Sequence, residues 1–138
     1  MMIAEEGKGD GSNSNVTDLL VRMFGHMAKF QYHPKDQSSS WVSSIIDSYN
    51  QLSEFQPSDK NAYERDFKLM DKAYSKSIKT VACAKSTGYK EDQFPESRPV
   101  SWTFKNVTNS SFILQFLFQN ANDRMMNKVE EMINDKMW

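Results

Sequence analysis

The sequence has little cysteine, glycine and proline, and it lacks a long hydrophobic segment. Its single cysteine, Cys83, excludes an intramolecular disulfide, a CxxC redox pair and a zinc site built from several thiolates. Five glycines and four prolines among 138 residues favour helices over a β-fold rich in turns. The longest apolar stretch, residues 112–118, is interrupted by Gln115 and is far shorter than the roughly 20 residues of a membrane span. We therefore expect an all-α protein that does not enter a membrane.

An excess of charge of one sign is also missing. Seventeen basic and eighteen acidic side chains leave a formal net charge of −1. This balance excludes a strongly basic protein that coats nucleic acid and a protein with a long acidic tail. Residues 1–15 hold three glycines and a run of serine and asparagine, without the apolar core of a signal peptide. We expect a flexible leader over residues 1–15, a single helical domain over 16–138, and a cytoplasmic location.

Apolar residues recur at the three- and four-residue spacing of amphipathic helices. The spacing predicts helices over residues 17–32, 40–55, 60–87 and 110–137, and a short turn helix over 102–107. We expect Gly88 to have a positive φ and to end the third helix, because glycine adopts the left-handed conformation without steric cost. Trp41 starts the apolar stripe of the second helix, and we expect it to anchor the core. The sequence thus predicts a compact bundle of four main helices plus a short turn helix.

The C-terminal segment has two interpretations. Residues 112–118 fit a buried strand or a buried helical stretch, which periodicity alone does not separate. A lone strand would leave backbone groups unpaired, and no partner strand is visible, so we favour a helix with a weak point at residues 119–120. The side chains expected to face inward are Leu114, Leu117, Phe118, Ala121, Met125, Val129, Met132 and Ile133.

Three stretches carry a resemblance to a known family. They are residues 20–34 (LVRMFGHMAKFQYHP), 38–45 (SSSWVSSI) and 73–104 (AYSKSIKTVACAKSTGYKEDQFPESRPVSWTF). Their order and spacing resemble the bacterial family called domain of unknown function 29. The positions that match its motifs include His26, Lys29, Tyr32, Pro34, Ser40, Trp41, Gly88, Pro95 and Trp102. The resemblance implies an all-α fold and no assigned activity, and the chain departs from the family pattern in its missing N-terminal helix pair and its extra C-terminal segment.

Basic side chains form one stripe on the predicted third helix. The stripe consists of Arg65, Lys68, Lys72, Lys76 and Lys79, at spacings of three, four, four and three. At about 100° per residue it lies roughly 160° from the apolar stripe of the same helix, so these side chains are expected to face outward. A solvated helix face and a contact surface for an anionic partner are the two interpretations. No aromatic residue is interleaved on this face, which argues against single-strand nucleic-acid binding.

The sequence contains no clear constellation for catalysis or metal binding. His26 and His33 are its only histidines, and a metal site needs three or four ligands. His26 lies at the edge of the apolar arc, where a structural, hydrogen-bonded histidine is the simplest interpretation. Cys83 has small neighbours and no nearby histidine, which does not favour a nucleophile. We therefore expect neither a metal nor a cofactor.

Three functional hypotheses remain, in descending order. The first is a non-catalytic protein-interaction or regulatory module of a bacterium or a mobile element. The second is a nucleic-acid-binding accessory protein that uses the basic stripe. The third is an enzyme with a site around His26, which ranks last because no orienting carboxylate is identifiable. The C-terminal segment can cover the other helices within one chain or cross to a second copy, so a monomer and a symmetric homodimer both stay open.

Overall fold

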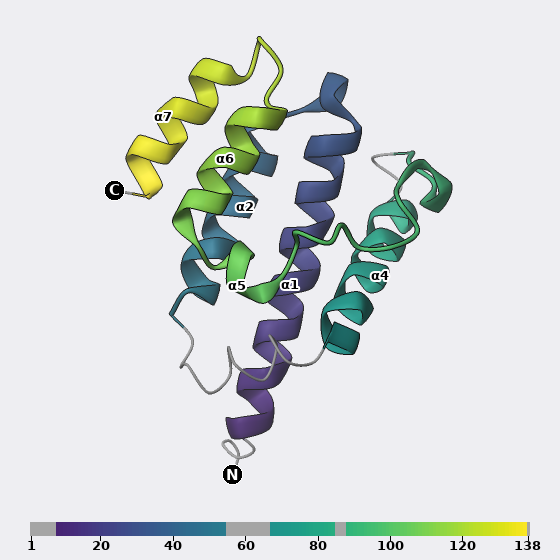
Figure 1. Cartoon of the computed structure of the whole chain (residues 1–138). Helices are drawn as coiled ribbons and strands as arrows, with labels where there is room; N and C mark the ends of the chain where they lie inside the picture. Colours follow the sequence, from purple (N-terminus) through teal and green to yellow (C-terminus); the bar gives the residue numbers. More distant parts are fainter. Residues whose placement is uncertain (1–7, 55–66, 85–87, 138) are drawn as a thin grey trace.

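The computed structural model describes residues 8–54, 67–84 and 88–137, which form helices joined by loops (Figure 1). In chain order the elements are α1 (Lys8–Tyr32), η1 (Pro34–Asp36), α2 (Ser39–Leu52), α4 (Phe67–Cys83), η2 (Glu91–Gln93), α5 (Phe104–Val107), α6 (Ser110–Asn120) and α7 (Met126–Lys136). No strand occurs in this part of the chain, so the prediction of an all-α fold is confirmed. Among these helices, none combines the length and the apolar character needed to cross a bilayer.

Helix α1 is the centre of the fold (Figure 1). It packs against α2 on one side and α4 on the other, while α6 and α7 pack against α2 and against each other. The central position explains why α1 buries apolar side chains over a broad arc, including Leu20, Phe24 and Phe30. The C-terminal helices thus cover α2 within a single chain.

The largest aromatic side chains of the core meet around Trp102. Its ring stacks on Phe24 of α1, with centroids 5.6 Å apart, and makes edge contacts with Tyr74 of α4 at 6.0 Å and Phe116 of α6 at 5.9 Å. Trp102 is only 2% exposed. Trp102 lies on the loop before α5, and its three ring contacts join this loop to α1, α4 and α6. The expected core anchor Trp41, in contrast, is half-buried at the edge of this core.

The ends of two helices differ from the sequence-based prediction. Helix α1 begins at Lys8, so residues 8–15 of the expected flexible leader are helical, since an established helix extends more easily than it nucleates. Helix α4 ends at Cys83, ahead of the predicted end near residue 87, and residues 55–66 and 85–87 lie outside the described part of the chain. Gly88 does have a positive φ, 70°, as predicted, but it lies five positions beyond the last residue of α4.

The C-terminal segment is two helices instead of the single predicted one. Helix α6 ends at Asn120, next to the weak point predicted at 119–120. The break is stabilised locally, because Asn122 Oδ1 accepts a hydrogen bond from the Met125 N–H at 2.9 Å. Phe118, expected to face inward, is 40% exposed, because the buried face of α6 is formed by Ile113, Phe116 and Leu117. The short helix α5 is capped by Thr103, whose Oγ1 accepts from the Asn106 N–H at 3.2 Å.

Gln37 is a buried polar residue that joins two turns. Its Nε2 donates to the carbonyl oxygens of Phe30, at 2.8 Å, and Asn120, at 2.7 Å, and its Oε1 accepts from the Asn122 N–H at 2.9 Å. One side chain therefore satisfies backbone groups at the ends of α1 and α6. Arg124 adds two longer contacts, at 3.3 Å each, to carbonyl oxygens of the first turn. This network ties the α1–α2 connection to the α6–α7 connection.

Replacing Gln37 is expected to destabilise the fold strongly. Gln37→Leu leaves two carbonyl oxygens and one N–H without their partner, and the free energy of unfolding should fall by about 2–3 kcal/mol. Urea denaturation measures this change. Gln51→Leu is the matched control, because the Gln51 amide is exposed and makes only one 3.4 Å contact to its own helix. Equal stability of the two variants would contradict a role for the network.

Candidate interaction surface on helix α4

Helix α4 places its lysines on the face opposite the core. Lys68, Lys72, Lys76 and Lys79 are all exposed, and we name this set the α4 lysine row. The buried side chains of the same helix are Met70, Ala73, Tyr74, Ser77, Ile78 and Val81. The predicted outward orientation is therefore confirmed for these four lysines, and Arg65 lies outside the described residues.

Three lysines of the row, Lys72, Lys76 and Lys79, keep their charge without an ion pair in the described part of the chain. The carboxylate of Asp71, on the same helix, is instead held by Arg98 Nε at 2.9 Å. The ammonium groups of Lys72, Lys76 and Lys79 are thus exposed to solvent and available to an anionic surface.

Arg98 fixes the loop that runs beside α4. Its side chain is only 8% exposed; besides Asp71, it donates from Nη1 to the Trp102 carbonyl oxygen at 2.9 Å. A second anchor joins the same loop to α4, because the Tyr74 hydroxyl donates to the Pro95 carbonyl oxygen at 2.7 Å. Burial, with a smaller effect of the neighbouring Tyr32, raises the pKa of Tyr74 to about 12, so this donor stays protonated at neutral pH.

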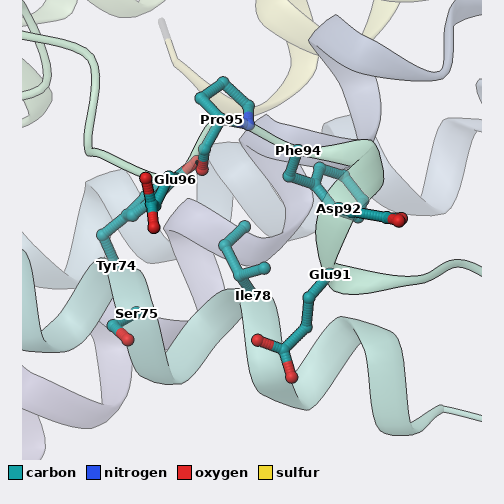
Figure 2. Close-up of a pocket in the computed structure, with 8 residues that line it drawn as sticks. All are labelled: Tyr74, Ser75, Ile78, Glu91, Asp92, Phe94, Pro95 and Glu96. Atoms are coloured by element: carbon teal, nitrogen blue, oxygen red, sulfur yellow. Dashed lines mark hydrogen bonds between the residues drawn. The ribbon is translucent and has the colours of Figure 1, made fainter.

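The anchored loop forms a groove along α4 (Figure 2). The groove has a volume of about 480 Å³ and is lined by Tyr74, Ser75, Ile78, Glu91, Asp92, Phe94, Pro95 and Glu96; we name it the acidic groove. In Figure 2 the Glu91 and Glu96 carboxylates lie toward its two ends, with Ile78 between them, while the Asp92 carboxylate points away. The three carboxylates form no ion pair with the described residues.

A second groove, of about 280 Å³, lies between α1 and α4 beside His26. His26 is half-buried, and its Nδ1 lies 2.8 Å from the Arg22 carbonyl oxygen. Burial lowers the pKa of His26, aided by the charges of Lys29 and Arg22 and partly opposed by the hydrogen bond. The ring is therefore oriented by its own helix and neutral near pH 7. Within the described residues, no group of three or more His, Cys, Asp or Glu side chains is placed to hold a metal ion.

Close packing of α1 and α4 beneath this groove depends on Gly25. A Cβ atom at Gly25 would lie 3.3 Å from Val81 Cγ2 and 3.9 Å from Ser77 Cβ. The missing side chain lets the two helices approach, which positions α4 and its lysine row relative to α1.

Lys29 and Trp41 form a contact between α1 and α2. The ammonium of Lys29 lies 4.9 Å from the centroid of the Trp41 ring, which is a cation–π arrangement. Burial lowers the pKa of Lys29. Ser40, next to Trp41, is exposed and pairs its hydroxyl with that of Ser38 at 2.9 Å. Trp41 and Ser40 therefore make contacts that stabilise the start of α2.

The end of α1 contacts the loop that follows Gly88. The ring of His33 stacks on Tyr89, with ring centroids 3.8 Å apart. Burial raises the pKa of the preceding residue, Tyr32. The Tyr89 hydroxyl donates to Asp36 Oδ2 at 2.7 Å. Asp36 is the last residue of η1, which begins at Pro34. His33 Nε2 is buried without a hydrogen-bond partner. Burial lowers the pKa of the His33 ring, and the negative charge of Asp36 raises it by a smaller amount.

The sequence-based site residues thus separate into two groups. The α4 lysine row faces solvent, and Pro34, Ser40 and Gly88 are exposed as well. The other positions lie at contacts among α1, α2, α4 and the loop: His26, Lys29, Tyr32, Trp41, Pro95 and Trp102. Sequence reasoning missed the acidic groove, Gln37 and Arg98. The acidic residues between Lys90 and Pro99 were the available signal for the groove.

The lowered histidine pKa values predict a stability that depends on pH. Both His26 and His33 bind protons more weakly in the folded state than at the unperturbed pKa of 6.5. The unfolded state therefore takes up more protons, and the free energy of unfolding should fall as the pH decreases from about 7 to about 5. Urea denaturation across this range measures the slope. The double variant His26→Gln with His33→Gln should be markedly less sensitive, and an unchanged slope would contradict the assignment.

Comparison with known proteins places the chain in a family. No curated protein and no solved structure matches the sequence. A family model described as "Domain of unknown function DUF29" matches residues 4–113, which is most of the chain. The match includes α1, α2, α4 and α5 and ends within α6, so α7 lies beyond it. The chain therefore belongs to the DUF29 family.

Proposed function

We propose that this protein is a non-catalytic helical interaction module that binds an acidic partner protein through the α4 lysine row. The observation that carries the proposal is the exposure of Lys72, Lys76 and Lys79 on one face, without an ion pair among the described residues. We place this function in the bacterial cytoplasm, in an accessory or regulatory role.

The surroundings of the row favour a protein over a nucleic acid. Three carboxylates of the acidic groove adjoin α4, and they would repel a phosphate backbone that extends beyond the row. The described part of the row's face offers no aromatic platform for bases, and Leu69, at 36% exposed, supplies an apolar contact instead. With a net charge of −1, the chain also lacks the long-range attraction to nucleic acid that a basic domain has.

The hypothesis of an enzyme around His26 receives less support. The described contact of its ring is a backbone carbonyl oxygen of the preceding turn, whereas a general base is usually oriented by a carboxylate or another polar side chain. The adjoining Arg22 and Lys29 are cations that disfavour a protonated imidazole.

Charge reversal on the row is expected to weaken partner binding strongly. The tagged double variant Lys72→Glu with Lys76→Glu should capture the partner from a lysate of the source cell at least about tenfold more weakly than the wild type. Capture by the wild type should also decrease with salt, because these contacts are solvent-exposed. Quantitative mass spectrometry of the captured proteins measures both effects.

A matched control separates this surface from a general effect of charge. The double variant Lys105→Glu with Lys128→Glu makes the same change in net charge at exposed positions on α5 and α7, and it should capture the partner like the wild type. Equal loss in both variants would contradict the proposal. Retention of duplex DNA or RNA by the wild type, lost only with the α4 variant, would identify a nucleic-acid-binding protein instead.

A further inference from the structure

The α4 lysine row and the acidic groove are adjoining strips of opposite charge. Ser75 lines the groove, and it lies one helical turn from both Lys72 and Lys79. The groove contributes the carboxylates of Glu91 and Glu96 on the other side of Ser75. Helix α4 is therefore shared by both strips.

Among the described residues, no ion pair joins Lys72, Lys76 or Lys79 to the acidic groove. Lys72, Lys76 and Lys79 form no ion pair with a residue in the described ranges, and neither do the three groove carboxylates. In the described ranges, three lysines without an ion pair thus lie beside the carboxylates of Glu91 and Glu96. The anchors of the loop, Tyr74 to Pro95 and Arg98 to Asp71, hold the carboxylates in place beside the helix.

Such a surface is complementary to itself. A two-fold axis through the boundary between the strips puts the lysine row of one copy against the acidic groove of the other, and this contact occurs twice. The net charge of −1 means that two copies hardly repel each other at long range. The groove also offers an apolar floor, formed by Ile78, Phe94 and Pro95, to the aliphatic part of a lysine side chain.

We propose that the acidic partner of the α4 lysine row is the acidic groove of a second copy of this chain, in a symmetric dimer with two equivalent contacts. This inference rests on the proposed function, since it names the partner of the same row. Exposed ion pairs are individually weak, so the dimer is reversible and dissociates with salt.

Exchange of charges between the strips tests the proposal. The row variant carries Lys72→Glu and Lys76→Glu, and the groove variant carries Glu91→Lys and Glu96→Lys. Each alone should raise the dimer dissociation constant by about tenfold or more, because the substituted side chains face charges of the same sign in both contacts. An equimolar mixture should restore dimers, since both contacts between the two variants then pair opposite charges. Analytical ultracentrifugation over a concentration series, at low and high salt, measures the wild type, each variant and the mixture.

The outcomes separate this inference from the proposed function. The wild type should dimerise at low salt, and the double variant Lys105→Glu with Lys128→Glu should dimerise like it. A wild type that stays monomeric, a dimer insensitive to both variants, or a mixture that fails to restore dimers overturns the inference. Capture of a different acidic protein by a monomeric wild type, lost in the row variant, would leave the proposed function standing. Circular dichroism of each variant confirms that it is folded.

Discussion

Trp102→Ala is expected to lower the free energy of unfolding by about 3–5 kcal/mol, as large aromatic-to-alanine changes in cores do. Trp102 lies on a loop, but its ring is 2% exposed and contacts Phe24, Tyr74 and Phe116. These three residues belong to α1, α4 and α6, so the cavity left by the substitution lies where three helices meet. Collapse around the cavity is restricted, since the Tyr74 hydroxyl is held by the Pro95 carbonyl oxygen.

Trp41→Ala serves as the control for this prediction. Trp41 is half-buried, so its removal loses part of an aromatic contact area and the interaction with the Lys29 ammonium. The expected cost is about 1–2 kcal/mol. Urea denaturation of both variants gives the comparison, and an equal or larger cost for Trp41→Ala would contradict the central packing role of Trp102.

Helical periodicity accounts for the parts of the fold that the sequence predicts well. Leu20, Phe24 and Phe30 are buried on α1, and Tyr74 and Ile78 are buried on α4, as their spacing indicates. The same local rule positions the α4 lysine row, because side chains opposite a buried stripe must face solvent.

Contacts between distant residues account for what the sequence does not predict. Trp41 and Trp102 are equivalent as apolar residues in a pattern, and only the packing of α6 and the loop onto α1 places Trp102 in the centre. Gln37 bonds to residues more than 80 positions away. A polar residue in a turn carries no local sign of such burial, so periodicity misses it.

The acidic groove is a further example of non-local organisation. Glu91 and Glu96 lie in a segment that reads as an ordinary charged loop. Their position beside the lysines depends on Arg98 and on the Tyr74 hydroxyl, which hold the loop against α4. Sequence spacing therefore predicts the α4 lysine row, whereas the acidic groove depends on tertiary contacts that spacing does not reveal.

Removal of residues 110–138 is expected to abolish cooperative folding. The deleted segment contributes Ile113, Phe116, Leu117, Met125, Val129 and Ile133 to the core. Its absence exposes the face of α2 that α6 and α7 cover, and it leaves the Gln37 amide without two of its backbone partners. Exposed apolar surface of this extent favours aggregation or a compact state without fixed side-chain packing.

Near-ultraviolet circular dichroism, dye binding to exposed apolar surface, and thermal unfolding of the 1–109 fragment measure this effect. The fragment should keep helical signal while losing its aromatic signal and its sharp transition. The comparison is informative because the family match ends at residue 113, so the fragment retains nearly all of the matched region. A soluble fragment with a sharp cooperative transition would mean that the family region folds alone, with α6 and α7 packed onto a core that is already complete. A fragment that loses its aromatic signal and its sharp transition would mean instead that this chain completes the family core with helices from beyond the matched region.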